Sequence, residues 1–207
     1  SVYISGKVTD DIVNQIERVL GTDSFGKGLE PPMQSDKVIT VSDPKRIFTE
    51  YPNAMQSAIK LGQHSITRLH PDYPKLRVLV TLFGGYFGSR LMSNIREDKG
   101  YTYGIGAGMM FYPGTGLLAI SSETDNEYVE PLIKEVYHEI DKLHTETVSQ
   151  EELSTVKNYM LGEMCRSYES AFSLSDAWIF VHTSELPEDT FERSLQAVRE
   201  TDAAELM

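Results

Sequence analysis

The stretch from residue 103 to residue 123 has the pattern of a β-hairpin, and it limits the possible folds more than any other part of the sequence. Residues 103–111 and 117–123 have strand character, and the turn between them is Tyr-Pro-Gly-Thr-Gly. Proline and glycine in a short connection favour a tight reversal between antiparallel strands. Three glycines alternate with larger apolar residues along the first strand, so we expect one face of the hairpin to be nearly bare.

Helical patterns surround this hairpin. Apolar residues recur at helical spacing, and helices are expected at residues 10–21, 73–83, 89–98, 125–143 and 149–162, with two or three more from residue 172 to the end. Further strands are expected at residues 2–4, 38–41, 47–49 and 56–62. Thr124 with Glu127, and Ser149 with Glu152, have capping-box spacing. Strands interleaved with helices predict an α+β fold, a two-layer sandwich in which helices pack on a mixed or antiparallel sheet.

The composition argues against several classes of protein. The net charge of the 207-residue chain is -12, so we expect no nucleic-acid partner, because such proteins present a basic surface. No apolar run approaches the ~20 residues that span a membrane. Nothing marks a repeat or an interdomain linker, so residues 1–207 are expected to form a single domain, excised from a longer chain. We expect a soluble protein of the cytoplasm or the periplasm, with no signal that chooses between them.

An arginine and a tyrosine lie seven residues apart where the helix at 89–98 gives way to the hairpin. These residues are Arg96 and Tyr103. A guanidinium keeps its charge and offers a planar fork of donors, and a tyrosine hydroxyl donates one hydrogen bond. Two such donors aimed at a carbonyl oxygen could stabilise the oxyanion of a tetrahedral intermediate. The spacing alone is equally typical of a solvent-facing arginine and a tyrosine in a strand.

The chain lacks both H-x-x-E-H and H-E-x-x-H, the motifs that place zinc ligands on one face of a helix. His138 and Glu139 begin the second motif, but Lys142 stands where its second histidine would be. We therefore expect no metal or other cofactor in this chain. The single cysteine, Cys165, excludes an intramolecular disulfide, and its position in a helical pattern predicts a buried, inert thiol.

Gly84 and Gly85 lie between two predicted helices. A phosphate-binding loop would need a lysine and then serine or threonine after its glycines, and Ser89-Arg90 follows here instead. The two glycines are expected to form a tight turn between helices. Backbone plasticity beside a binding site is the other use of such residues.

Two neighbouring segments resemble a known peptidase family. Residues 82–91 read Leu-Phe-Gly-Gly-Tyr-Phe-Gly-Ser-Arg-Leu, and residues 94–103 read Asn-Ile-Arg-Glu-Asp-Lys-Gly-Tyr-Thr-Tyr. They are similar to the C-terminal-type domain of the M16 zinc metallopeptidases, which include pitrilysin, insulysin and the mitochondrial processing peptidase. The shared features are a glycine-rich turn, a Ser-Arg-Leu helix start, and an arginine seven residues before a tyrosine. Weaker matches in the same order extend the resemblance over essentially the whole chain.

The resemblance implies an α+β domain of the LuxS and mitochondrial-processing-peptidase metallohydrolase type. It also implies a homologous partner domain that carries H-x-x-E-H and the zinc, on the same polypeptide or on a second subunit. Arg96 and Tyr103 match the family's arginine and tyrosine, which reach into that zinc site. Arg96 would bind a carbonyl or carboxylate of a peptide substrate, Tyr103 would stabilise the oxyanion, and Gly84 and Gly85 would border the peptide. Tyr101 would be a packing residue, and the chain alone would be inactive.

Two other interpretations stay open. The same fold serves as a non-catalytic structural subunit, as in the core proteins of a respiratory complex. The retained spacing of Arg96 and Tyr103 argues against this role, because a scaffold has no need for both. An unrelated peptide-binding α+β module is the third possibility. An H-x-x-E-H motif upstream in the parent protein would favour the peptidase.

Overall fold

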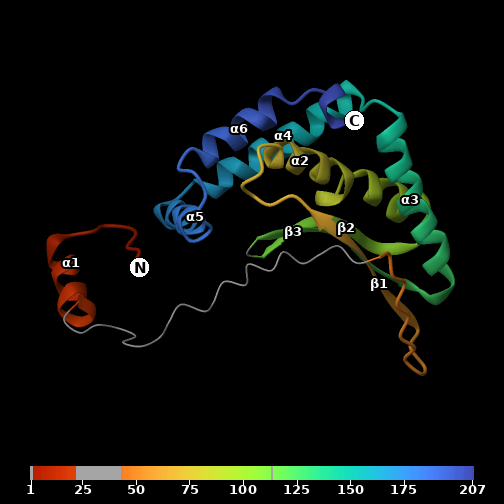
Figure 1. The fold of residues 1–207 in the computed structure, drawn as a ribbon, viewed down its shortest axis with the longest axis horizontal. Helices are drawn as coiled ribbons and strands as arrows, with labels where there is room; N and C mark the ends of the chain where they lie inside the picture. The colour runs from red at the N-terminus through yellow and green to blue at the C-terminus, as the bar shows by residue number, and fades with distance from the viewer. Residues whose placement is uncertain (1, 22–42, 113) are drawn as a thin grey trace.

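In a computed structural model, which describes residues 2–21, 43–112 and 114–207, helices pack on one face of an antiparallel β-sheet (Figure 1). The described strands are β1 (Gln56–Ser65), β2 (Thr102–Tyr112) and β3 (Thr115–Asp125), and β3 lies between the other two. This arrangement confirms the predicted two-layer α+β fold.

β2 and β3 form the predicted hairpin. Their register places Tyr112 opposite Thr115. Gly114 in the turn has a φ of 75°, a left-handed conformation that glycine adopts without steric penalty. β1 includes the strand predicted at 56–62 and pairs with β3 along its whole length.

Helices form in the predicted regions. The α-helices are α1 (Asp10–Ile16), α2 (Tyr73–Val80), α3 (Val129–Thr145), α4 (Gln150–Ser167), α5 (Ala171–Thr183) and α6 (Thr190–Glu200). Wider π-helical segments are η1 (Glu17–Gly21), η2 (Thr81–Gly85) and η3 (Met92–Asp98), and short 3-10 turns are η4 (Asn126–Tyr128) and η5 (Ala204–Leu206). Within the described ranges, no helix is both long and apolar enough to span a bilayer.

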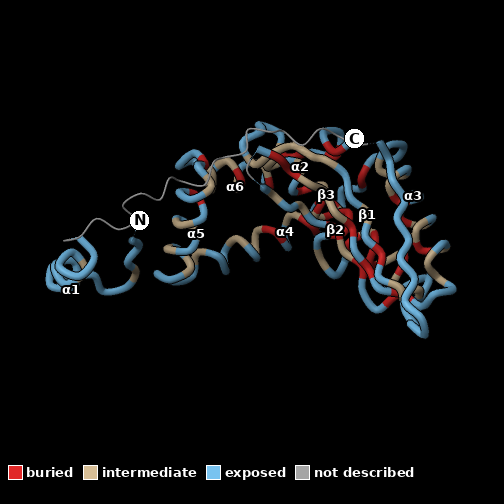
Figure 2. Tube along the Cα trace, turned by 60° about the horizontal axis from the view of Figure 1, so that its bottom comes forward, coloured by how far each residue is buried: buried red, intermediate tan, exposed pale blue. Residues whose placement is uncertain are grey.

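The core lies between the sheet and the helices above it, where Figure 2 shows the buried residues gathered. The first core cluster joins strands to η3 and α3, and it includes Ile59, Ile105, Ile120, Ile95, Leu132 and Val136. A second cluster joins α2, α4 and α6 through Val78, Val156 and Val198. Each fully buried aliphatic side chain contributes about 1.5–3 kcal/mol. The first cluster therefore holds the helical layer against the sheet, and the second holds the helices together.

The opposite face of the sheet carries small residues along its middle, as the alternating glycines predicted. Gly106 of β2 lies opposite Ser121 of β3, and Gly108 lies opposite Ala119. Gly108 and Ser121 are exposed. Ile105, Ala107 and Met109 of β2 belong to the core under the helical layer, and the outer face of the hairpin is shallow beside Gly108.

The strand predicted at residues 2–4 is wrong. This segment lies along α5 instead of joining the sheet. The Tyr3 hydroxyl contacts the His182 ring, and the Ser5 hydroxyl donates to the Ala171 carbonyl at 2.6 Å. Side-chain contacts to a helix thus replace the ladder that the β-branched residues suggested.

Two further predictions fail, and a third falls outside the described chain. Residues 47–49 form no strand. Thr124 does not cap α3, because it belongs to β3 and its hydroxyl donates to the Tyr101 carbonyl. The strand predicted at 38–41 lies outside the described residues.

Cys165 is exposed, not buried as predicted. It lies on α4 five residues after the buried Met160. At 3.6 residues per turn, five residues rotate the side chain by about 140° from that buried stripe. The apolar neighbours in sequence therefore occupy a different face of the helix.

Candidate functional site

Arg96 and Tyr103 meet at the corner between η3 and β2. The Arg96 Nε donates a hydrogen bond of 3.0 Å to the Tyr103 backbone carbonyl. The Arg96 guanidinium carbon also lies 4.6 Å from the centre of the Phe87 ring, within cation–π range. The structure thus brings the predicted pair together, through the tyrosine backbone rather than through its phenol.

The Tyr103 side chain points into solvent because β2 has a bulge at this point. Thr102 pairs with Thr124 and Ile105 with Ser122, so β2 holds one more residue than β3 between these two pairs. Regular alternation would place Tyr103 on the same face as the buried Ile105, yet Tyr103 is 93% exposed. Its hydroxyl makes no hydrogen bond to the described residues, and it is free to donate to a ligand.

Phe87 adds an aromatic surface to this corner that the sequence motifs did not predict. It follows η2, and 61% of its surface is exposed. Its ring and the Tyr103 carbonyl hold the Arg96 guanidinium from two directions. The Arg96 Nη1 is 3.5 Å from a Glu97 carboxylate oxygen, a surface pair that contributes little. The sequence signal that could have pointed to Phe87 is a large aromatic residue inside a glycine-rich turn.

Gly84 lies where η2 crosses β2, and the contact leaves no room for a side chain. A Cβ there would lie 2.6 Å from the Ala107 nitrogen and 2.7 Å from the Ala107 Cβ. Gly85 is exposed, and its Cβ would come no closer than 3.3 Å, to the Val80 carbonyl oxygen. Gly84 thus has a packing role, and the substrate-binding role of both glycines stays a prediction.

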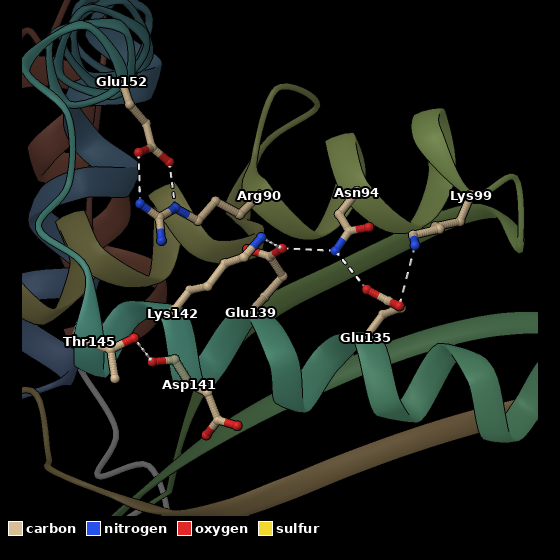
Figure 3. A network of polar contacts seen from close by, with 9 residues as sticks. All are labelled: Arg90, Asn94, Lys99, Glu135, Glu139, Asp141, Lys142, Thr145 and Glu152. Atoms are coloured by element: carbon tan, nitrogen blue, oxygen red, sulfur yellow. Dashed lines mark hydrogen bonds and ion pairs between the residues drawn. The ribbon is translucent and has the colours of Figure 1, made fainter.

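Figure 3 shows a network of charged and polar side chains that links residues 90–99 to α3 and α4. Arg90 donates two hydrogen bonds to Glu152, Nε to Oε1 at 2.7 Å and Nη2 to Oε2 at 2.9 Å. The hydrogen bond to Glu152 raises the pKa of Arg90 above its ordinary value. Ser149 caps α4 as predicted, accepting from the Glu152 N–H at 3.1 Å. The reciprocal bond of the predicted capping box is replaced, because the Glu152 carboxylate binds Arg90.

The second arm of this network surrounds Glu139 on α3, which is only 4% exposed. Asn94 donates to Glu139 at 2.8 Å, and Lys142 binds the same carboxylate at 2.9 Å. A buried carboxylate is costly unless such partners satisfy it. These bonds therefore fix the helical segment around Asn94, which is two residues from Arg96.

Glu135 is expected to stabilise the protein at neutral pH and to lose this effect at acid pH. A hydrogen bond from Asn94 at 3.1 Å, with the nearby charge of Lys99, lowers the pKa of Glu135 below 4.5. A lowered pKa gives stability that is present above the ordinary value and is lost as the pH falls through the folded-state pKa. We expect Glu135→Gln to cost up to about 1 kcal/mol of unfolding free energy at pH 7, and less as the pH drops below 4.5.

Urea unfolding of wild type and variant between neutral and acid pH measures this difference. Glu169→Gln is the matched control, because Glu169 is exposed and has no ion pair among the described residues. A Glu135→Gln effect that stays constant across the whole pH range would contradict the assignment.

The M16 resemblance implies zinc, and the described part of this chain does not fit it. Across residues 2–21, 43–112 and 114–207, no group of three His, Cys, Asp or Glu side chains is placed to hold a metal ion. Glu139, next to His138 on α3, is already bound by Asn94 and Lys142. The described residues therefore offer no zinc site of the kind that the resemblance implies.

Similarity to a family model shows which protein family the chain belongs to. A family model described as "Peptidase M16 inactive domain" matches residues 1–160. The chain belongs to the M16 peptidase family. The match includes the whole Arg96–Tyr103 corner and the helical layer as far as α4.

This chain corresponds to part of the length of three similar proteins. It is 27% identical over 175 residues to the uncharacterized zinc protease YmxG of Bacillus subtilis, covering 83% of this chain and 41% of that protein. It is 22% identical over 206 residues to the probable inactive metalloprotease YmfF of the same species, covering 97% and 47%. A crystal structure of a peptidase M16 inactive domain from Pseudomonas fluorescens matches with a TM-score of 0.68 and 27% identity, covering 74% of this chain and 37% of that one. The chain spans less than half the length of these relatives.

Proposed function

We propose that this M16 domain assists peptide-bond hydrolysis at a zinc site held by a second M16 domain with the H-x-x-E-H motif. The observation that carries the proposal is the Arg96–Tyr103 corner. The arginine is anchored on the Tyr103 carbonyl, while the phenol stands free and 93% exposed. A bulge that turns a large aromatic side chain into solvent is typical of the neighbourhood of active sites.

In this proposal the two donors act on different states of the peptide. Arg96 would bind a carbonyl or carboxylate of the bound peptide through guanidinium nitrogens that the Tyr103 carbonyl leaves free. The Tyr103 hydroxyl would donate to the scissile carbonyl oxygen as it gains negative charge, so its bond would strengthen in the transition state. Gly84 and Gly85 would border the peptide. The zinc and the general base would come from the partner domain, so the chain alone would be inactive.

Replacing Arg96 with alanine tests the binding role. In the parent protein, assembled with its zinc-bearing domain, Arg96→Ala should raise KM for a fluorogenic peptide pool about tenfold or more, because a charged hydrogen bond contributes about 1.5–3 kcal/mol. Arg96→Lys should recover only part of the loss, since an ammonium group cannot reproduce the planar fork. Steady-state kinetics with and without a chelator measure both effects.

Zinc content and thermal unfolding of the variants are the controls. A variant that loses stability but keeps the wild-type KM would mean that Arg96 only holds the Tyr103 carbonyl. A parent protein that contains zinc but cleaves no peptide would reject the proposal.

A non-catalytic structural subunit is the second candidate, and the relationship to YmfF favours it, because that relative is named a probable inactive metalloprotease. In such a subunit the contact between Arg96 and Tyr103 would only stabilise the corner of β2. Zinc analysis of the parent protein and its partner separates the two candidates. Complete absence of zinc from a stable assembly would support the structural role.

A further inference from the structure

Side chains, instead of the regular strand ladder, hold the β2 bulge that exposes Tyr103. Gly104, which follows Tyr103, donates from its backbone N–H to the Thr102 hydroxyl at 3.0 Å. Its carbonyl accepts a hydrogen bond of 2.9 Å from the Ser122 hydroxyl. Gly104 has no opposite residue in the register with β3. Both of its backbone groups are nevertheless hydrogen-bonded, to side chains rather than to β3.

The two hydroxyl groups form a closed set with matching donors and acceptors. Thr102 and Ser122 are 9% and 7% exposed, and their oxygens lie 3.1 Å apart. The shortest contact of the Thr102 hydroxyl is to the Glu123 carbonyl, at 2.6 Å. Because a hydroxyl has one hydrogen, a Thr102 hydroxyl that donates to Glu123 is left to accept from Gly104. The Ser122 hydroxyl is then the group that donates to the Gly104 carbonyl.

Arg96 completes the support of the bulge by binding the Tyr103 carbonyl. Three polar groups of two successive residues, the Tyr103 carbonyl and the Gly104 N–H and carbonyl, are each bound by a side chain. Without these partners, regular pairing with β3 would be more stable than the bulge. Regular pairing would turn Tyr103 toward the face of Ile105, because a one-residue slip exchanges the two faces of a strand.

We propose that Thr102 and Ser122 are positioning residues, whose hydroxyls hold the Gly104 backbone so that the Tyr103 phenol points away from the core. The effect on catalysis rests on the proposed function of Tyr103, whereas the effect on the bulge does not. Neither residue touches the substrate. Their loss should therefore act on the rate of the chemical step through Tyr103.

Thr102→Val and Thr102→Ser form a matched pair for the test, carried out in the full parent protein with its zinc-bearing domain. Valine keeps the shape of threonine and removes the hydroxyl, whereas serine keeps the hydroxyl. In Thr102→Val the Gly104 amide should exchange with solvent about tenfold faster than in Thr102→Ser, because its hydrogen-bond acceptor is gone. The kcat of Thr102→Val should fall on the order of 10-fold or more with a smaller change in KM, since a 1 Å misplacement of a catalytic group costs up to 10²-fold.

Ser122→Ala is a second variant with the same expected signature, in case Thr102→Val folds poorly. Ser121→Ala is the control, because Ser121 is the neighbouring, exposed serine of β3 and should keep wild-type exchange and kcat. Unchanged Gly104 exchange in both Thr102→Val and Ser122→Ala would overturn the inference. Faster exchange with an unchanged kcat would also overturn it if Tyr103→Phe lowers kcat. If Tyr103→Phe has no effect, the proposed function fails, and exchange alone decides the role of the two hydroxyls.

Discussion

Replacing Tyr103 with phenylalanine in the assembled parent protein is expected to lower kcat for peptide cleavage on the order of 10²-fold, with KM nearly unchanged. The reason is that the phenol would donate to an oxygen whose negative charge develops only in the transition state. Removing one such donor costs about 2.7–4 kcal/mol of transition-state stabilisation. Because the side chain is 93% exposed and the variant loses only its hydroxyl, the stability of the fold should not change.

Tyr112→Phe is the matched control for this measurement. Tyr112 ends the same strand, is also exposed, and lies at the hairpin turn rather than at the Arg96 corner. Its variant should cleave peptides at the wild-type rate. If Tyr103→Phe and Tyr112→Phe both retain the wild-type kcat in a zinc-loaded protein, the phenol has no part in catalysis.

Gly84→Ala is expected to lower the stability of the fold strongly. The new Cβ would lie 2.6 Å from the backbone nitrogen and 2.7 Å from the Cβ of Ala107, so η2 and β2 would have to move apart. Overpacking of this kind costs about 1–3 kcal/mol or more. For a domain of this size, that loss lowers the melting temperature by about 2–12 °C.

Gly85→Ala separates this steric effect from a general intolerance of the turn. The closest atom to its new Cβ is the Val80 carbonyl oxygen at 3.3 Å, and helix propensity favours alanine over glycine by about 1 kcal/mol. Its melting temperature should stay within about 3 °C of wild type. Calorimetry on the three proteins measures the difference, and equal losses at Gly84 and Gly85 would refute the close-contact explanation.

The sequence predicted the hairpin, the helices and the Arg96–Tyr103 corner because each depends on local patterns. Turn residues at 112–116 and helical apolar spacing around them report on nearby structure. The strand expected at residues 2–4 does not form, because the conformation of this segment depends on contacts with α5, which is distant in sequence. Local β-propensity could not show that Ser5 would bind a helix end.

The geometry of the candidate site could not be predicted from the sequence either. The bulge that exposes Tyr103 depends on Ser122, which lies on the other strand of the hairpin, and on the register between the two strands. Alternation alone would have placed Tyr103 beside Ile105. Phe87 was missed because its contact is a ring face against Arg96, which no sequence spacing specifies.

The most direct test of the account is the cleavage rate of the Arg96→Ala/Tyr103→Phe double variant, measured on the zinc-loaded parent assembly next to both single variants. Because Arg96 is proposed to act on substrate binding and Tyr103 on the transition state, their losses in kcat/KM should approximately multiply. We predict full zinc content, wild-type stability within about 1 kcal/mol, and a kcat/KM lowered by about the product of the two single losses. A double variant that retains its zinc and cleaves peptides as fast as wild type would contradict the central claim.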